Sequence, residues 1–116
     1  MAQKIKNSQI DPVSRQSNWG YINNTGTVNN ISTTVTFPVA FATVPKSIIA
    51  TLTGYRATGS GAPTSLADFN NGYGANYSQS IFITGVSTTG FTLNISAGTS
   101  NSIGASYLGY SWTAEV

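Results

Sequence analysis

The chain has 116 residues, of which 40% are hydrophobic and only 7% are charged, far below the roughly 25% of an average soluble domain. This length is enough for one domain with a modest core, and Ser, Thr, Asn and Gly take the place of charge. The five basic and three acidic side chains are scattered, whereas nucleic-acid-binding domains carry clustered Lys and Arg. No apolar run is long enough to cross a bilayer. We therefore expect neither binding to nucleic acid nor insertion into a membrane.

Residues 1–18 differ in composition from the rest of the chain. They hold three of the five basic residues and only isolated apolar positions. We interpret 1–18 as a linker or the end of a shaft that belongs to a longer protein, and 19–116 as the folded domain.

From Trp19 onward, apolar and polar residues alternate with the period of two that is typical of half-buried strands. The main alternating segments are 33–37, 47–55, 80–86, 90–97 and 106–116. The predicted inward positions are Val35, Phe37, Ile48, Ala50, Leu52, Phe91, Leu93, Ile95, Ala97, Leu108, Tyr110, Trp112 and Ala114, with Val116 next on the same face.

Two connections have recognisable sequences. In Val35–Pro45, Pro38 is expected to end strand pairing, Phe41 to anchor the crossing segment in the core, and Pro45 to restart the chain before the next strand. The stretch is therefore predicted to form a corner. Ser87–Gly90 is predicted to be a short turn in which Gly90 adopts a positive φ.

These segments indicate an all-β domain, most economically a small antiparallel β-sandwich of about six strands, with a small barrel as the alternative. The chain has no cysteine, so it has no disulfide framework. Oligomerisation is a common source of stability for such small domains.

Catalysis is not expected. A glycoside hydrolase normally uses two carboxylates, and the chain offers only Asp11, Asp68 and Glu115. Neither a Ser-His-Asp triad nor a typical zinc site can form without histidine and cysteine. The segment 68–72 resembles a calcium loop, but Gln79 stands where the bidentate Glu is required, so a polar turn is favoured. We expect no metal and no cofactor.

The long interruption 55–79 is the main candidate for a binding site, because binding residues concentrate on loops that a rigid scaffold positions. Sugar recognition uses aromatic rings for stacking and amide, carboxylate or guanidinium groups for the hydroxyls. The candidate ligand-binding residues are Tyr55, Arg56, Asp68, Asn70, Tyr73 and Tyr77. The alternative is that the tyrosines pack the loop against itself or a neighbouring subunit, while Arg56 and Asp68 pair. The loop 98–106 is a lesser candidate.

Several motifs occur in a familiar order: Asn18-Trp19-Gly20, Val35–Phe41, Ser87–Phe91 and Trp112-Thr113-Ala114. Over residues 18–116 this pattern resembles the C-terminal receptor-binding domain of bacteriophage tail fibres, and it is similar to the wider H-type lectin fold. The resemblance implies a six-stranded sandwich that assembles as a homotrimer and binds sugars. It also implies an Arg with aromatic or acidic groups at the sugar site, for which Arg56 is the candidate.

The resulting hypothesis is a non-catalytic tail fibre tip domain of a virion that binds a host cell-surface glycan, such as lipopolysaccharide, outside the cell. The first alternative is a structural trimerisation cap or fibre connector without glycan binding. The second is a cellular H-type lectin or adhesin.

Overall fold

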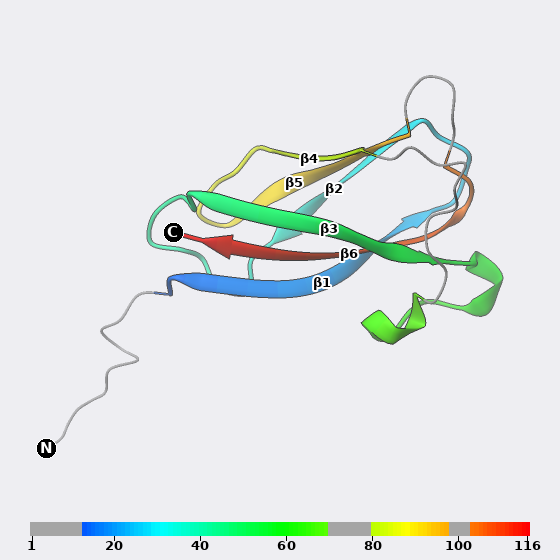
Figure 1. Ribbon diagram of the computed structural model, residues 1–116, viewed down its shortest axis with the longest axis horizontal. Helices are drawn as coiled ribbons and strands as arrows, with labels where there is room; N and C mark the ends of the chain where they lie inside the picture. The colour runs from blue at the N-terminus through cyan, green and yellow to red at the C-terminus, as the bar shows by residue number, and fades with distance from the viewer. Residues whose placement is uncertain (1–12, 70–79, 98–102) are drawn as a thin grey trace, which may run out of the picture.

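The computed structural model describes residues 13–69, 80–97 and 103–116, and its strands form two facing layers (Figure 1). No α-helix occurs in these three ranges, and no helix among them is long and apolar enough to cross a membrane. Two single turns of 3-10 helix follow the third strand, η2 (Thr58–Ser60) and η3 (Leu66–Asp68). The strands are β1 (Arg15–Asn24), β2 (Asn30–Thr36), β3 (Ser47–Arg56), β4 (Ser80–Thr84), β5 (Gly90–Ser96) and β6 (Ser106–Glu115).

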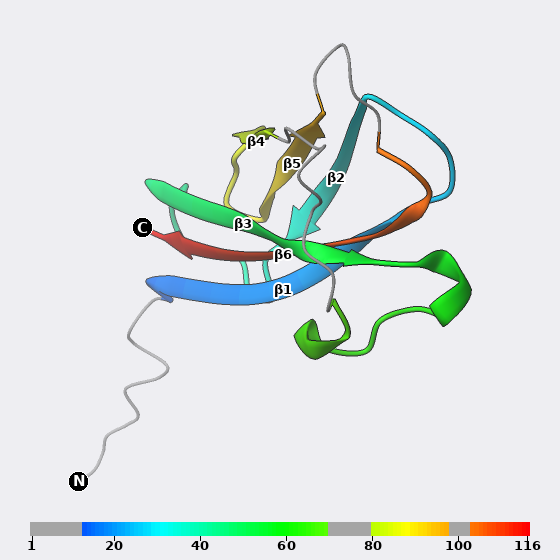
Figure 2. The ribbon, with the colours of Figure 1, turned by 45° about the vertical axis from the view of Figure 1, so that its right-hand side comes forward.

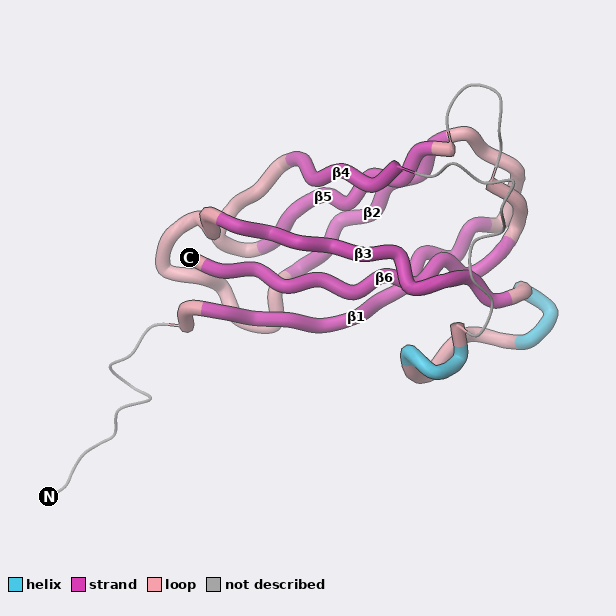
Figure 3. Tube along the Cα trace, viewed as in Figure 1, coloured by secondary structure: helices cyan, strands magenta, loops and turns pink. Residues whose placement is uncertain are grey.

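Each layer is a three-stranded sheet, with strand orders β1-β6-β3 and β2-β5-β4 (Figure 3). All four pairings are antiparallel, and β6 and β5 are the central strands. The predicted all-β antiparallel sandwich of six strands is therefore confirmed. The division into 1–18 and 19–116 stays a prediction; residues 1–12 lie outside the described ranges, and β1 already begins at Arg15.

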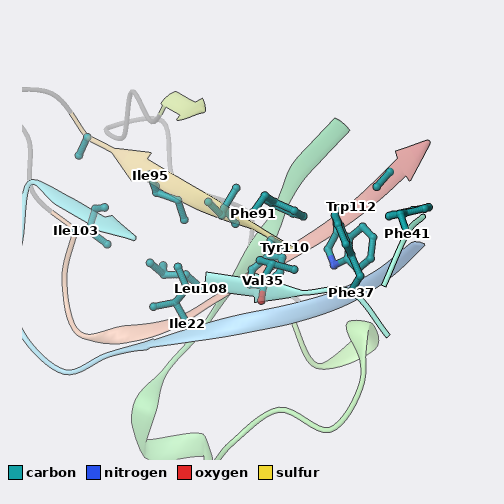
Figure 4. Close-up of a cluster of buried hydrophobic side chains, with 13 residues drawn as sticks. Ile22, Val35, Phe37, Phe41, Phe91, Ile95, Ile103, Leu108, Tyr110 and Trp112 are labelled. Atoms are coloured by element: carbon teal, nitrogen blue, oxygen red, sulfur yellow. The ribbon is translucent and has the colours of Figure 1, made fainter. Parts of the chain in front are cut away.

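The core fills the space between the two sheets, where the inward positions of β2, β5 and β6 meet (Figure 4). Phe37 lies against Phe41, Phe91 and Trp112, with ring centroids 4.9, 5.8 and 5.4 Å apart. The predicted inward residues of β2, β5 and β6 are buried, and those of β3 are partly buried against the same cluster. Val116 is the exception: it lies beyond the end of β6 and is 41% exposed.

The predicted corner after β2 is an ordered part of the sandwich. The amides of Phe37 and Phe41 donate to the carbonyls of Thr89 and Thr88, at 2.9 and 2.8 Å, so the segment is fastened to the β4–β5 turn. The Gln16 side chain donates to the Val39 carbonyl at 2.6 Å and accepts from the Val39 amide at 3.0 Å. Phe41 is buried, as predicted.

The prediction for Gly90 is wrong. Its φ is not positive; the glycine of this connection with a positive φ is Gly85, at 61°. Gly90 instead begins β5 opposite Thr36, and a Cβ at this position would collide with the Val35 carbonyl oxygen. Glycine is needed here for a close approach of two backbones.

The chain enters and leaves the sandwich at the same end. Arg15, at the start of β1, pairs with Glu115 at the end of β6, and the Val116 amide donates to the Ser14 carbonyl at 3.0 Å. Figure 1 shows the C-terminus beside the first residues of β1.

Candidate functional site

The outer face of the β1-β6-β3 sheet carries a row of four aromatic side chains, here called the outer aromatic row: Trp19, Tyr21, Phe69 and Tyr107. Tyr21 stacks with Trp19 at 6.4 Å between ring centroids and meets Tyr107 edge-on at 5.6 Å. Trp19 in turn meets Phe69 edge-on at 6.1 Å. The row thus joins β1 and β6 to the residue that follows η3.

Phe69 is the anchor of the segment 57–69. It is buried, and its ring lies over Gly109 at the centre of the sheet, where a Cβ would come within 2.8 Å of the ring. Figure 2 shows the segment folding back beneath the sheet after β3. The Phe69 ring can therefore pack against the sheet here because position 109 has no side chain. Thr53, at the irregularity of β3 between Leu52 and Gly54, contributes a buried hydroxyl to which no described group is hydrogen-bonded.

Arg56 fastens the same segment from its other end. Its Nε and one terminal nitrogen donate to the carbonyls of Gly61 and Ser60, at 2.9 and 2.8 Å. The other terminal nitrogen donates to the Asp68 carbonyl at 3.3 Å. Arg56 lies opposite Tyr107, whereas the preceding Tyr55 lies opposite Leu108 and packs against the core.

The Asp68 carboxylate closes the turn that contains η3. One carboxylate oxygen accepts from the Thr64 amide at 2.6 Å, from the Thr64 hydroxyl at 3.0 Å and from the Ser65 amide at 3.2 Å. These donors, the Thr64 amide above all, hold the pKa of Asp68 below its ordinary value, with a smaller contribution from the Arg56 charge.

An open groove of about 360 Å³ lies beside this segment, between η3 and the outer face of the sheet. Its apolar part comes from Trp19 of β1, Ile49 of β3 and Leu66 of η3. Ile49 is 66% and Leu66 42% exposed, which is high for aliphatic side chains. The volume lies in the range of small-molecule sites.

The polar residues that line the groove are Asn18 and four hydroxyl-bearing residues from the three strands: Ser17, Thr51, Ser111 and Thr113. None of the described residues that line the groove is charged. The groove therefore offers an indole, aliphatic groups and hydroxyls on a rigid sheet.

Of the predicted site residues, the structure brings together Arg56 and Asp68 at the two ends of the segment 57–69, whereas Tyr55 packs against the core. Arg56 and Asp68 contact each other through the Asp68 carbonyl, and the Asp68 carboxylate is directed to Thr64 and Ser65. Asn70, Tyr73 and Tyr77 lie outside the described residues, as do residues 98–102 of the second candidate loop. The described residues contain no group of three or more Asp or Glu that could hold a metal ion.

The groove itself was not among the sequence predictions. A signal for part of it exists: Ile22 faces the core, so Trp19 and Tyr21, at odd spacing from it, must face outward. Alternation along β1 therefore places a Trp and a Tyr on the outer face of the sheet. The contribution of Leu66 has no comparable signal, because it depends on where Phe69 docks.

No family model matches the chain, and no curated protein sequence matches it. Among solved structures, the chain is similar to the tailspike gp61 of Pseudomonas phage phi297, with a TM-score of 0.57 and 11% identity over 88% of this chain. The likeness shows a shared fold, and this chain spans 15% of the tailspike's length.

Two R1 pyocin structures are also similar to the chain. One is an N-truncated R1-type pyocin tail fibre, with a TM-score of 0.47 and 23% identity over 84% of this chain and 67% of that one. The other is the R1 pyocin fibre of P. aeruginosa comprising C-terminal residues 323–701, with the same TM-score and identity over 84% of this chain and 22% of that one.

Proposed function

We propose that this chain is the receptor-binding tip domain of a phage tail fibre, which binds a host cell-surface glycan and performs no chemistry. The observation that carries the proposal is the groove on the outer face of β1-β6-β3. It combines an indole with hydroxyl groups and has no charged lining residue among those described. The fold shared with a phage tailspike supports the setting.

In this proposal the domain has an H-type lectin-like fold and acts as a homotrimer at the fibre tip of the virion. Each groove binds one part of a surface polysaccharide, such as lipopolysaccharide, with low affinity. Three identical sites on one rigid tip bind the same cell surface together, and such linkage raises apparent affinity by about 10²–10⁴ without new contacts. Because none of the described groove residues is charged, binding in the groove should also depend little on salt concentration.

The test is a glycan array with the purified chain, together with its mass in solution by sedimentation and its binding to host cells. We expect a trimer that binds a defined set of glycans. A stable trimer that binds neither glycans nor cells would contradict the proposal.

The second candidate is a structural cap or connector of a fibre. The exposure of Ile49 and Leu66 favours it, because exposed aliphatic side chains also mark contacts between subunits. In that case the groove is closed by another copy of the chain. Hydrogen exchange around Leu66 in the assembled protein distinguishes the two: slow exchange that is lost on dissociation indicates a cap, and fast exchange an open site.

A further inference from the structure

The groove beside η3 has a chemical character that points to a particular kind of sugar. We propose that it binds a neutral pyranose ring that carries a methyl group, either a 6-deoxyhexose or an N-acetylhexosamine. This inference rests on the proposed function and goes further, because it names the ligand class and the residues that select it.

The first argument is charge. The described residues that line the groove include no Lys, Arg, Asp or Glu. Of the two charged residues on the adjoining segment, Arg56 donates to backbone carbonyls and the Asp68 carboxylate accepts from Thr64 and Ser65. An acidic sugar would lose water from its carboxylate without gaining a cation. A neutral sugar meets no such cost.

The second argument is the set of available hydroxyls. Within the part of the chain that the structure describes, the side chains of Ser17, Thr51, Ser111 and Thr113 make no hydrogen bond to another residue. Each hydroxyl can donate one hydrogen bond and accept two. They stand on three adjacent strands of a rigid sheet, so a ligand with several hydroxyls can bind them without reordering the backbone.

The third argument is the aliphatic surface. Trp19 provides an aromatic surface for the C–H side of a pyranose ring, but this contact does not account for Ile49 and Leu66. Both side chains line the groove from different elements and remain largely exposed. A ring with hydroxyls at every position would place polar groups against them. A methyl group would cover them, and one buried methyl group corresponds to about fourfold tighter binding.

The experiment compares free monosaccharides by saturation-transfer NMR and by tryptophan fluorescence on the full chain. The probes are L-rhamnose and L-fucose for the deoxy group, N-acetylglucosamine for the acetamido group, L-mannose, L-galactose and glucose as the respective parents without a methyl group, and glucuronic acid as the charged sugar. We expect one methyl-bearing sugar to bind about fourfold tighter than its parent, and glucuronic acid not to bind. Which methyl-bearing sugar binds distinguishes the two sources of the methyl group.

The selecting residue is tested with Ile49→Thr, which removes aliphatic surface and keeps a β-branched strand residue. We expect this variant to lose the fourfold difference in affinity between the methyl-bearing sugar and its parent. Val44→Thr is the matched control, since Val44 is similarly exposed but lies in the connection between β2 and β3. It should leave the preference unchanged.

The outcomes separate this inference from the proposed function. Glycan binding without a preference for methyl-bearing sugars, or a preference that Ile49→Thr leaves intact, overturns the inference and leaves the proposed function standing. If no sugar binds and Ile49→Thr instead weakens the oligomer, both the inference and the proposed function are wrong. The groove is then a contact between copies of the chain.

Discussion

Replacing Gly109 by Ala tests whether a glycine at the centre of β6 is what allows the segment 57–69 to dock. The added Cβ would lie 2.8 Å from two carbons of the Phe69 ring and 2.5 Å from the Thr53 hydroxyl. The ring would have to move by roughly 0.6 Å to restore an ordinary contact of 3.4 Å. Overpacking of this kind costs about 1–3 kcal/mol. We expect the free energy of unfolding, from urea titration followed by circular dichroism, to fall by that amount.

The cause is isolated by repeating the substitution in a Phe69→Ala background. Phe69→Ala alone should cost about 3–5 kcal/mol, as for other buried Phe side chains. In that background, Gly109→Ala should lower the free energy of unfolding by less than about 1 kcal/mol more. The Phe69 ring is then absent, and the Thr53 hydroxyl can rotate away from the added Cβ. Gly59→Ala is the control in the same segment, where nothing lies within 4 Å of the added Cβ. An equal cost of Gly109→Ala in both backgrounds would refute the reasoning.

Three further predictions concern polar groups. Asn24→Ala removes side-chain hydrogen bonds to the carbonyls of Ile103 and Gly104, at 3.2 and 2.8 Å, and should lower the free energy of unfolding by about 1–3 kcal/mol. A urea titration beside the exposed-neighbour variant Asn23→Ala checks this, and equal effects of the two would contradict it. The Asp68 carboxylate has a lowered pKa, so its stabilisation of the segment 57–69 is present above its ordinary pKa of 3.8 and is lost as the pH falls through the lowered value. The protection of that segment against hydrogen exchange, taken relative to the intrinsic exchange rate at each pH, should therefore fall on acidification in the wild type and not in Asp68→Asn; parallel profiles would show another group to be responsible. Burial raises the pKa of Tyr110, so the folded state should lose stability as the pH rises past 10.0, and Tyr110→Phe, compared by urea titration across that range, should remove this loss. The same loss in both proteins would exclude Tyr110 as its cause.

The core was predictable because the signal for it is local. In a strand with one buried face, apolar and polar residues must alternate. Phe91, Leu93 and Ile95 therefore mark the buried face of β5, and Trp112 marks the buried face of β6. The glycine of the β4–β5 turn was not predictable in this way. Which of Gly85 and Gly90 has the positive φ depends on where strand pairing ends on each side of the turn. The pairing of β5 with β2 includes Gly90, so Gly90 is part of a strand and Gly85 lies in the turn.

The candidate site was predictable only in part. The long interruption after β3 identified a segment with Arg56 and Asp68, and the structure does bring these two together. Their contact holds a turn in shape, which the residue types alone cannot distinguish from a contact with a ligand. The position of Leu66 beside Trp19 follows from the docking of Phe69 on Gly109, which are 40 residues apart in the chain and share no local pattern.

The pairing of Arg15 with Glu115 has an evolutionary consequence. Because β1 and β6 begin and end side by side, both points of attachment lie at one end of the sandwich. Such a unit can be transplanted into another polypeptide, at a terminus or within a surface loop, without rethreading either sheet. Recombination at these two points would move the sandwich as a whole and leave the strand pairing of both sheets intact.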